Sequence, residues 1–343
     1  NWNDLHDKYK PQAMAASTDQ DFRYIFNLML GQLNASHMGM YGSSPEQTIK
    51  DRTGRLGIEV RQGKNGLVVS HVVKNSPADR SQSKINEGDI ILEVDGQKLT
   101  ENTNFYELFQ DESNNEVLMK LKAKSGKTRE IAIRPSRSLG NLLYEEWVRE
   151  RKRLVEEYSG GRLGYIHIQG MNFPSFERFE RELTASGLGK EGIVIDVRFN
   201  GGGWTTDYLM AVLNVKQHAY TVPRGAAKNL EKENGKFKEF YPYSERLPLA
   251  SWTKPSIAMC NESSYSNAEI FSHAYKQLGL GTLVGQPTFG AVISTGGKGL
   301  LDGSFIRMPF RGWYVKSSGM NMENGPAVPD VIVENAPDDR AKE

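Results

Sequence analysis

The C-terminal half of the chain alternates short apolar runs with segments of helical period. Apolar runs bounded by turn residues are typical of strands buried on both faces. Strands are therefore predicted at residues 163–168, 192–197, 256–260, 281–285 and within 303–315, and helices at 176–183, 207–215 and 267–278. This order predicts an α/β domain with a mixed sheet flanked by helices.

The N-terminal half shows other patterns. Phe22, Ile25, Phe26 and Met29 recur at helical spacing and predict a helix that stops near Gly31, followed by a loop or short strand. Further on, β-branched residues and glycine turns predict a compact, mostly-β unit, and a charged helical stretch follows it. The predicted segments are residues 1–50 (helical), 51–135 (mostly β), 136–160 (helical connector) and 161–343 (α/β core).

A polar insertion interrupts the predicted core at residues 217–252, with Pro223, Gly225, Gly235 and Pro242 inside it. The segment is too long for a simple connection between a helix and a strand. Loops of this length usually line or cover a site, so we expect the insertion to do so.

Composition narrows the function classes. The 343 residues are 38% hydrophobic and 25% charged, which suffices for buried cores and argues against global disorder. A net charge of +1 indicates neither a nucleic-acid nor a membrane-surface partner. Cys260 is the only cysteine, which excludes an internal disulfide and a multi-cysteine metal site. The sequence shows no cluster of metal ligands and no apolar run of membrane-spanning length, so neither a cofactor nor a membrane span is predicted.

The strand predicted at 256–260 breaks into a short polar loop before the next helix opens. Such a turn exposes a nucleophile where orphan backbone N–H groups and the helix dipole stabilise a developing oxyanion. Ser263, Ser264 and Ser266 all lie in this loop, and Ser266 is favoured because it stands immediately before the helix. Cys260, at the end of the apolar strand, is interpreted as a small buried hydrophobic side chain.

Another predicted strand ends in a glycine run, Gly201-Gly202-Gly203. Successive glycines carry a high conformational entropy, so they suggest a backbone task such as close approach to a substrate carbonyl. A nucleophile elbow with a glycine N–H donor is the minimum apparatus for acyl transfer. A serine nucleophile also needs a general base, and histidine is the usual one. Among the six histidines, His273 is close to Ser266 in the sequence, but a helix carries it about two turns away from Ser266.

The mostly-β unit carries motifs of a specific domain type. It carries the segments 54–60, Ser76-Pro77-Ala78 and Gly88-Asp89 at a specific spacing, and in these it resembles a PDZ domain. In that family the loop holding Leu56, Gly57 and Ile58 presents backbone N–H groups to a peptide carboxylate, and the peptide adds a strand to the sheet edge. The alternative is a PDZ fold kept as a rigid spacer or lid with an unused groove.

With these motifs together, the whole chain resembles the serine peptidases of the C-terminal processing and tricorn type, which implies a core of the ClpP/crotonase-like type. The segment 266–270, Ser-Asn-Ala-Glu-Ile, matches the nucleophile segment of the processing peptidases. Their general base is a lysine in a Phe-Gly-Lys-Gly segment, where this chain reads Phe289-Gly290-Ala291-Val292. Ala291 stands where the lysine should be, so the Ser–Lys dyad is missing.

The tricorn branch uses instead a histidine from the N-terminal helical segment, in a Ser-His pair that Ser36-His37 matches. Imidazole suits a general base because its ordinary pKa lies close to neutrality. In tricorn a glutamate near the C-terminus acts through the serine beside the histidine, and the segment around Glu323 resembles it. The resemblance implies a nucleophile (Ser266), a base (His37), two residues that hold the base (Ser36, Glu323) and two oxyanion donors (the N–H groups of Gly202 and Asn267). The tricorn nucleophile is followed by aspartate, whereas Asn267 stands here.

The resemblance implies a peptidase acting on peptides or unfolded protein segments. Two alternatives stay open. One is a non-catalytic peptide-binding or scaffolding protein that keeps the fold and uses the PDZ groove. The other is a peptidase with a different base, such as Lys298.

Tricorn proteins carry β-propeller domains upstream of this core and form oligomers. This chain begins at Asn1, without a methionine or a signal-like segment. We therefore expect a processed product or a fragment, with an upstream β-propeller and a homo-oligomer implied by the resemblance. A tricorn-like protein would be cytoplasmic and a processing peptidase extracytoplasmic, and the sequence does not choose between these compartments.

Overall fold

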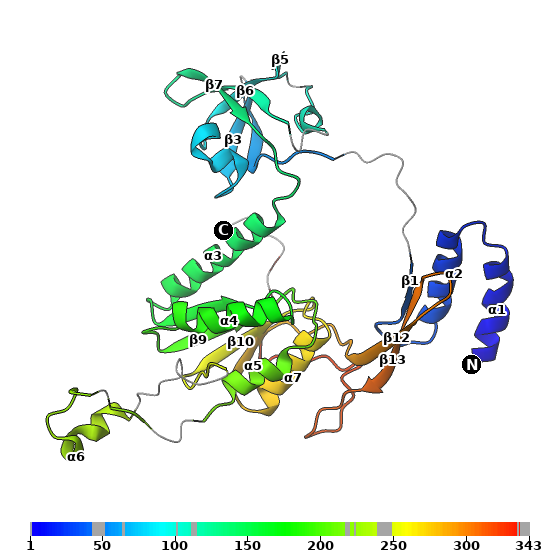
Figure 1. Cartoon of the computed structure of the whole chain (residues 1–343), viewed down its shortest axis with the longest axis vertical. Helices are drawn as coiled ribbons and strands as arrows, with labels where there is room; N and C mark the ends of the chain where they lie inside the picture. The colour runs from blue at the N-terminus through cyan, green and yellow to red at the C-terminus, as the bar shows by residue number, and fades with distance from the viewer. Residues whose placement is uncertain are drawn as a thin grey trace. The chain divides into compact units, whose positions relative to one another are not determined.

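The computed structural model describes residues 2–42, 52–63, 66–100, 102–110, 115–216, 220–222, 224–238, 249–334 and 336 (Figure 1). Contacts between residues divide the chain into two compact units, one made of residues 1–45 with 152–343 and the other of 46–151. The four boundaries expected from the sequence stay predictions. In the predicted insertion, residues 217–219, 223 and 239–248 lie outside the described residues, and the short helix α6 (Leu230–Glu233) lies between them.

A five-stranded parallel sheet forms the centre of the larger unit (Figure 1). Its strands in sheet order are β14 (Val331–Ile332), β11 (Gly281–Gly285), β10 (Ser256–Cys260), β9 (Gly192–Asp196) and β8 (Leu163–His167). The predicted α/β class is confirmed with one correction, since every pairing in this sheet is parallel rather than mixed. A crossover helix follows each of β8, β9 and β10 and returns the chain to the same edge, which makes neighbouring strands parallel.

These crossover helices are α4 (Phe173–Ala185), α5 (Thr206–Leu213) and α7 (Asn267–Gln277). Their apolar faces and the sheet share one core, which includes Cys260 as expected. In the register of β9 and β10, Asp196 lies opposite Met259. The loops that follow these two strands therefore leave the sheet side by side, at the edge where open α/β sheets bind ligands.

A separate antiparallel sheet joins the two ends of the larger unit. The strand β1 (Gly39–Tyr41) pairs with β13 (Phe305–Gly312), and β13 pairs with β12 (Ile293–Gly299). Gly39 lies opposite Arg307 in the first pair. The residues just before β1 are therefore fixed beside the C-terminal part of the chain.

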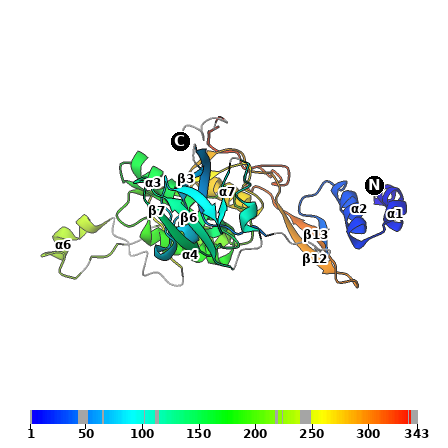
Figure 2. The same cartoon turned by 90° about the horizontal axis from the view of Figure 1, so that it is seen from above.

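Two N-terminal helices, α1 (Trp2–Met14) and α2 (Asp19–Gly31), pack around Tyr9, Met29 and Leu30. The predicted helix end near Gly31 is confirmed. The Asn27 side chain exchanges two hydrogen bonds with the backbone of Met40, so α2 is tied to the antiparallel sheet, beside which it lies in Figures 1 and 2. Among the described residues, no helix is both long and apolar enough to cross a lipid bilayer.

The smaller unit is a mostly-β domain, as predicted, and its strands pair antiparallel. Its strands are β2 (Ile58–Gly63), β3 (Gly66–Val72), β4 (Ile90–Val94), β5 (Gln97–Lys98), β6 (Val117–Lys122) and β7 (Thr128–Ile133). They enclose a core of their own that includes Leu56, Ile85 and Phe109. The long helix α3 (Gly140–Tyr158) follows and contains the boundary between the two units.

Candidate active site

Ser266 stands at the sharp turn between β10 and α7. Its backbone has φ 58° and ψ −117°, a combination that residues with a Cβ rarely adopt and that strains the turn. The Ser266 N–H donates to the Glu269 Oε1 at 3.0 Å, a contact typical of a capping box. The turn thus holds the Ser266 hydroxyl at the N-terminus of α7, next to the carboxyl edge of the sheet.

Glu269 is fully buried and joins this turn to the segment 288–291. Besides the Ser266 N–H, its carboxylate accepts from the Thr288 hydroxyl (2.8 Å), the Ala291 N–H (2.9 Å) and the Gly290 N–H. Four donors satisfy the buried carboxylate, and the start of a helix favours an anion. The sequence analysis gave Glu269 no role of its own and named it only as part of the segment 266–270. Its spacing from Ser266, Ser-x-x-Glu, is nevertheless the signature of a capping box.

His37 reaches Ser266 from a segment 229 positions away, and its Nε2 lies 2.8 Å from the Ser266 Oγ. This separation is within hydrogen-bond range. His37 has a positive φ of 62° and stands two residues before β1, so the pairing of β1 with β13 holds it in place. The structure therefore brings together the serine and the histidine singled out in the sequence.

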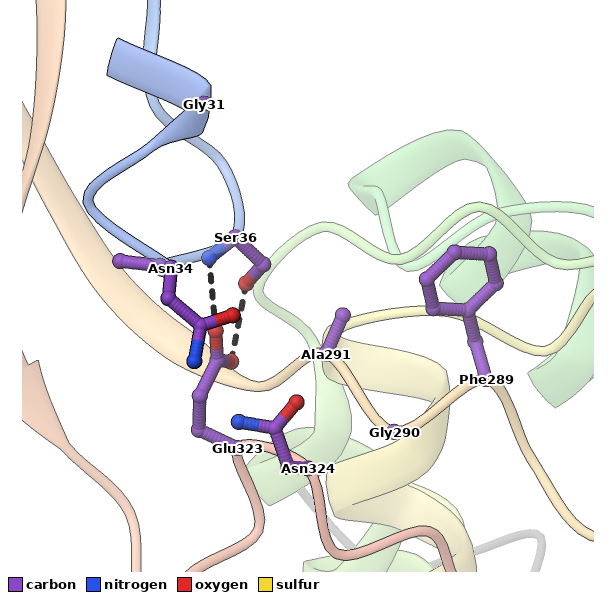
Figure 3. A pocket seen from close by; sticks show the side chains of 9 residues that line it. Gly31, Asn34, Ser36, Phe289, Gly290, Ala291, Glu323 and Asn324 are labelled. Carbon is purple, nitrogen blue, oxygen red and sulfur yellow. Dashed lines mark hydrogen bonds between the residues drawn. The ribbon is translucent and has the colours of Figure 1, made fainter. Parts of the chain in front are cut away.

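Ser36 and Glu323 form a relay behind the imidazole. The His37 Nδ1 lies 2.7 Å from the Ser36 Oγ, and Ser36 donates to Glu323 through its hydroxyl (2.9 Å) and its N–H (2.6 Å). Figure 3 shows both bonds to the carboxylate. A serine hydroxyl has one proton, so a Ser36 that donates to Glu323 must accept from an Nδ1–H. The neutral imidazole then presents the lone pair of Nε2 to Ser266.

Gly202 and Asn267, the two oxyanion donors expected from the sequence, flank Ser266. A Cβ added at Gly202 would lie 2.7 Å from the Ser266 Cβ and 2.9 Å from the Asn267 N, and the φ of +89° also favours glycine. The Gly202 N–H donates to the Asn200 Oδ1 at 2.9 Å, whereas the Asn267 N–H makes no hydrogen bond within the described residues. Of these two N–H groups, only that of Asn267 has no partner among the described residues, and the missing side chain of Gly202 leaves space beside it.

Known families account for most of the chain. The pattern of peptidase family S41 matches residues 162–333, which is half of the sequence, and that of the PDZ domain matches residues 46–121. The chain belongs to peptidase family S41. Its PDZ match falls in the smaller unit, where the sequence predicted it.

Tricorn proteases are similar to this S41 chain over nearly its whole length. The chain is 28% identical to the tricorn protease of Thermoplasma volcanium, over 97% of this chain and 32% of that protein. It is 29% identical to the tricorn protease homolog of Saccharolobus solfataricus, over 99% of this chain and 31% of that protein. The crystal structure of the tricorn protease superposes with a TM-score of 0.84 at 27% identity, over 99% of this chain and 32% of that one. The chain thus spans about a third of the length of these relatives.

The competing residues named from the sequence lie in other surroundings. Ser264 is buried and donates to the Val197 carbonyl (2.9 Å), and Ser263 is exposed on the loop. The His273 Nε2 lies 3.1 Å from the Gly325 carbonyl, so that nitrogen carries a proton. Lys298 is an exposed residue of β12. In the part of the chain that is described, none of these side chains is hydrogen-bonded to Ser266.

The Asn267 side chain ties α7 to α5. Its Oδ1 accepts from the Thr206 N–H (3.0 Å), and the Thr206 hydroxyl reaches the Asn267 carbonyl oxygen (2.8 Å). Both residues are buried, so the neutral amide avoids placing a carboxylate among packed side chains. Asn267 is therefore held by Thr206 through its side chain and its backbone carbonyl, while its N–H makes no hydrogen bond to a described residue.

Three influences act on the His37 imidazole. Burial lowers its pKa from the usual value, the Arg307 guanidinium lowers it further, and the Glu323 carboxylate opposes both. The net shift is downward, so the ring is neutral at neutral pH and can accept a proton. The Tyr265 ring stacks on the His37 imidazole. No pattern in the sequence indicated this neighbour.

A pocket of about 290 Å³ opens beside the relay (Figure 3). The Glu323 carboxylate and the Asn34 and Asn324 amides lie on one side, and Phe289 and Ala291 lie on the other. Ala291, at which the resemblance led us to expect a lysine in a processing peptidase, therefore borders open space next to the relay. Within the described ranges, no group of three or more His, Cys, Asp or Glu side chains is arranged to hold a metal ion.

The predicted peptide-binding loop belongs to the smaller unit. Its carbonyls are engaged, since Leu56 accepts from the Ala78 N–H (3.0 Å) and Gly57 from the Val73 N–H (2.9 Å). The N–H groups of Leu56 and Gly57 make no hydrogen bond to the residues that the structure describes, and Ile58 begins β2. The loop thus has two N–H groups without a partner among the described residues, and a peptide carboxylate would need such donors.

Proposed function

We propose that this chain is a serine peptidase in which Ser266 is the nucleophile and His37 the general base. The 2.8 Å contact between the His37 Nε2 and the Ser266 Oγ carries the proposal. His37 takes the Ser266 proton as Oγ bonds to the substrate carbonyl carbon, and gives it to the leaving amine as the C–N bond breaks. Water then attacks the acyl-enzyme, loses a proton to Nε2, and Ser266 recovers that proton as the ester opens.

Ser36 and Glu323 act on the base rather than on the substrate. Their bonds fix the tautomer in which Nε2 is free to accept the Ser266 proton. Once His37 is protonated, the Glu323 charge stabilises the imidazolium, which agrees with its raising effect on the His37 pKa. Burial and Arg307 act in the opposite direction, and so keep the imidazole neutral before the reaction.

The Asn267 N–H is the donor for the oxyanion that forms when Ser266 attacks. It is open and borders the space that the missing Gly202 side chain leaves. The Gly202 N–H can join it only by leaving the Asn200 Oδ1. We therefore assign one donor that is ready before substrate binds and a second that the bound carbonyl must recruit.

Peptides and unfolded protein segments are the proposed substrates, cut by an endopeptidase or oligopeptidase reaction. Acyl transfer at Ser266 suits an amide bond, and the open N–H groups of Leu56 and Gly57 suit the carboxylate at the end of a peptide. The upstream β-propeller and the homo-oligomer that the tricorn resemblance implies stay predictions.

A fluorophosphonate probe, which labels activated serines, tests this proposal together with hydrolysis of a quenched peptide. The wild type should be labelled and should cleave the peptide, and Ser266→Ala should do neither. Ser263→Ala is the matched control, because it removes an exposed hydroxyl from the same loop. Labelling at a serine other than Ser266 would contradict the mechanism. A folded wild type that binds peptides without labelling or cleavage would instead support the non-catalytic alternative.

A further inference from the structure

Tyr265 stands immediately before the nucleophile and contacts the base directly. Its ring lies over the His37 imidazole, with centroids 4.7 Å apart and planes 20° from parallel. Its hydroxyl oxygen lies 3.1 Å from the His37 Nδ1, the nitrogen that also contacts Ser36. The Phe289 ring meets Tyr265 edge-on, at 5.0 Å and 83°, and supports it on another side.

We propose that Tyr265 is a positioning residue for His37, which fixes the plane of the imidazole while Ser36 fixes its Nδ1. This inference rests on the proposed function, since it gives Tyr265 a role in base catalysis. A ring held through one nitrogen can still tilt about that contact, and Nε2 then moves away from the Ser266 Oγ. A second ring stacked on the imidazole opposes the tilt and keeps Nε2 directed at the nucleophile.

The backbone of Tyr265 is itself fixed on both sides. Its N–H donates to the Asn200 carbonyl at 2.9 Å, and its carbonyl accepts from the Ala268 N–H at 3.1 Å. The phenol ring therefore projects from the rigid start of the elbow, one residue before Ser266. His37 comes from a different segment, which the β1–β13 pairing holds in place, and the neighbour of Ser266 in the chain lies against its ring.

The ring and the hydroxyl of Tyr265 act on the imidazolium in opposite directions. Burial raises the pKa of the phenol, so the hydroxyl keeps its proton at neutral pH and its oxygen is a neutral acceptor. That oxygen favours a protonated His37 by sharing the Nδ1–H. The ring disfavours it, because the ring excludes water from one face of the imidazole and burial is the largest influence on the His37 pKa.

Two substitutions separate these effects. Tyr265→Phe removes only the hydroxyl, and Tyr265→Ala removes the ring as well. Titration of the His37 signal by NMR in histidine-labelled protein, assigned through His37→Gln, needs neither substrate nor activity. We expect Tyr265→Phe to lower the His37 pKa and Tyr265→Ala to raise it. Tyr158→Ala, which changes a tyrosine that is 81% exposed, is the control and should leave the titration unchanged.

Peptide hydrolysis provides the second readout. Loss of one hydrogen bond should lower kcat about 3- to 10-fold in Tyr265→Phe. A misplaced base should lower it about 100-fold in Tyr265→Ala, and a residue that acts only on the base should leave KM unchanged in both variants. Circular dichroism and thermal melting establish that each variant is folded.

An unchanged His37 titration in both folded Tyr265 variants would overturn the proposal, even if activity fell. Activity losses that appeared in KM alone would overturn it too. The failure of the proposed function looks different: a wild type without hydrolysis or probe labelling. In that case a lowered His37 pKa in Tyr265→Phe and a raised one in Tyr265→Ala would still support the positioning contact between Tyr265 and His37. The absence of both shifts would overturn that contact.

Discussion

Replacing Glu323 by glutamine is the sharpest perturbation of the relay, because it exchanges one oxygen for an NH₂ group of nearly the same shape. The glutamate accepts two hydrogen bonds from Ser36, one from the N–H and one from the hydroxyl. A glutamine amide can accept only one of them, since its nitrogen is a donor. When its oxygen faces the Ser36 N–H, its NH₂ group donates to the Ser36 Oγ, and the hydroxyl turns its proton toward the His37 Nδ1.

That arrangement satisfies every donor but reverses the relay. A neutral imidazole whose Nδ1 accepts from Ser36 carries its proton on Nε2, where it cannot take the proton of Ser266. In a Ser-His-Asp triad the corresponding change lowers kcat by about 10⁴ through the wrong tautomer. Because Glu323 acts through Ser36 and is only partly buried, we expect a loss in kcat/KM of about 10²–10³, or about 2.7–4.1 kcal/mol.

Hydrolysis of an internally quenched peptide measures the loss, with Ser36→Ala as the matched comparison. Ser36→Ala removes the relay without reversing it, because the Nδ1–H still has the Tyr265 hydroxyl oxygen as an acceptor. That variant should lose about 10-fold in kcat/KM, the equivalent of one hydrogen bond. Once Ser36 is alanine, Glu323→Gln should add little, because no hydroxyl is left to turn.

The double variant Ser36→Ala/Glu323→Gln distinguishes a reversed relay from an independent effect of Glu323. Losses that multiply in Ser36→Ala/Glu323→Gln would refute the reversal, because they would show Glu323 acting independently of Ser36. A Glu323→Gln protein with nearly wild-type kcat/KM would refute the relay itself. In either case the contact of His37 with Ser266 would have to be oriented by other groups.

Three further predictions concern pH, the space in front of Asn267 and the peptide-binding loop. Because burial and Arg307 lower the His37 pKa, kcat/KM should fall on acidification only below the usual imidazole value of about 6.5, and an acid limb above neutrality would contradict this. Gly202→Ala should lower kcat about 100-fold or more, since its Cβ would crowd the Asn267 N–H, whereas Gly201→Ala meets nothing within 4 Å and should stay active. Peptides with a free carboxylate should show a lower KM than their C-terminal amides at similar kcat, because the amides lose about 1.5–3 kcal/mol of charge-assisted bonding to the Leu56 and Gly57 N–H groups. Equal KM values would make the PDZ unit a spacer.

Four strands of the parallel sheet, β8, β9, β10 and β11, could be predicted because each contains an apolar run that is recognisable without its neighbours, whereas β14 has only two residues and was not predicted. The strands β1 and β12 could not be predicted either. A strand of three residues, such as Gly39–Tyr41, is too short to show alternation. The strand β12 contains Gly296, Gly297 and Gly299, which have no side chains to alternate, and it forms by pairing with β13.

The residues of the candidate site likewise fall into those that the local sequence indicates and those that only the fold brings together. Ser266 followed from local chemistry, because its strand, loop and helix are contiguous in the sequence. Nothing local marks His37, since the antiparallel sheet delivers it across 229 positions, and only a family resemblance pointed to it. The hydrogen bond that engages the Gly202 N–H depends on the Asn200 side-chain conformation, and Tyr265 becomes significant only once His37 is known to lie against it.

Ser266 and His37 both have positive φ angles, so each member of the reacting pair has a backbone conformation that costs on the order of 1–3 kcal/mol. Different contacts offset the two strains. The Glu269 carboxylate fixes the elbow, whereas the β1–β13 pairing and the bonds from Ser36 to Glu323 fix the histidine segment. Ser266 and His37 are therefore supported separately and meet through one hydrogen bond and the Tyr265 ring. Loss of the β1–β13 pairing would withdraw the proposed base without disturbing the elbow, so the proposed activity of Ser266 would depend on a strand of three residues outside the core sheet.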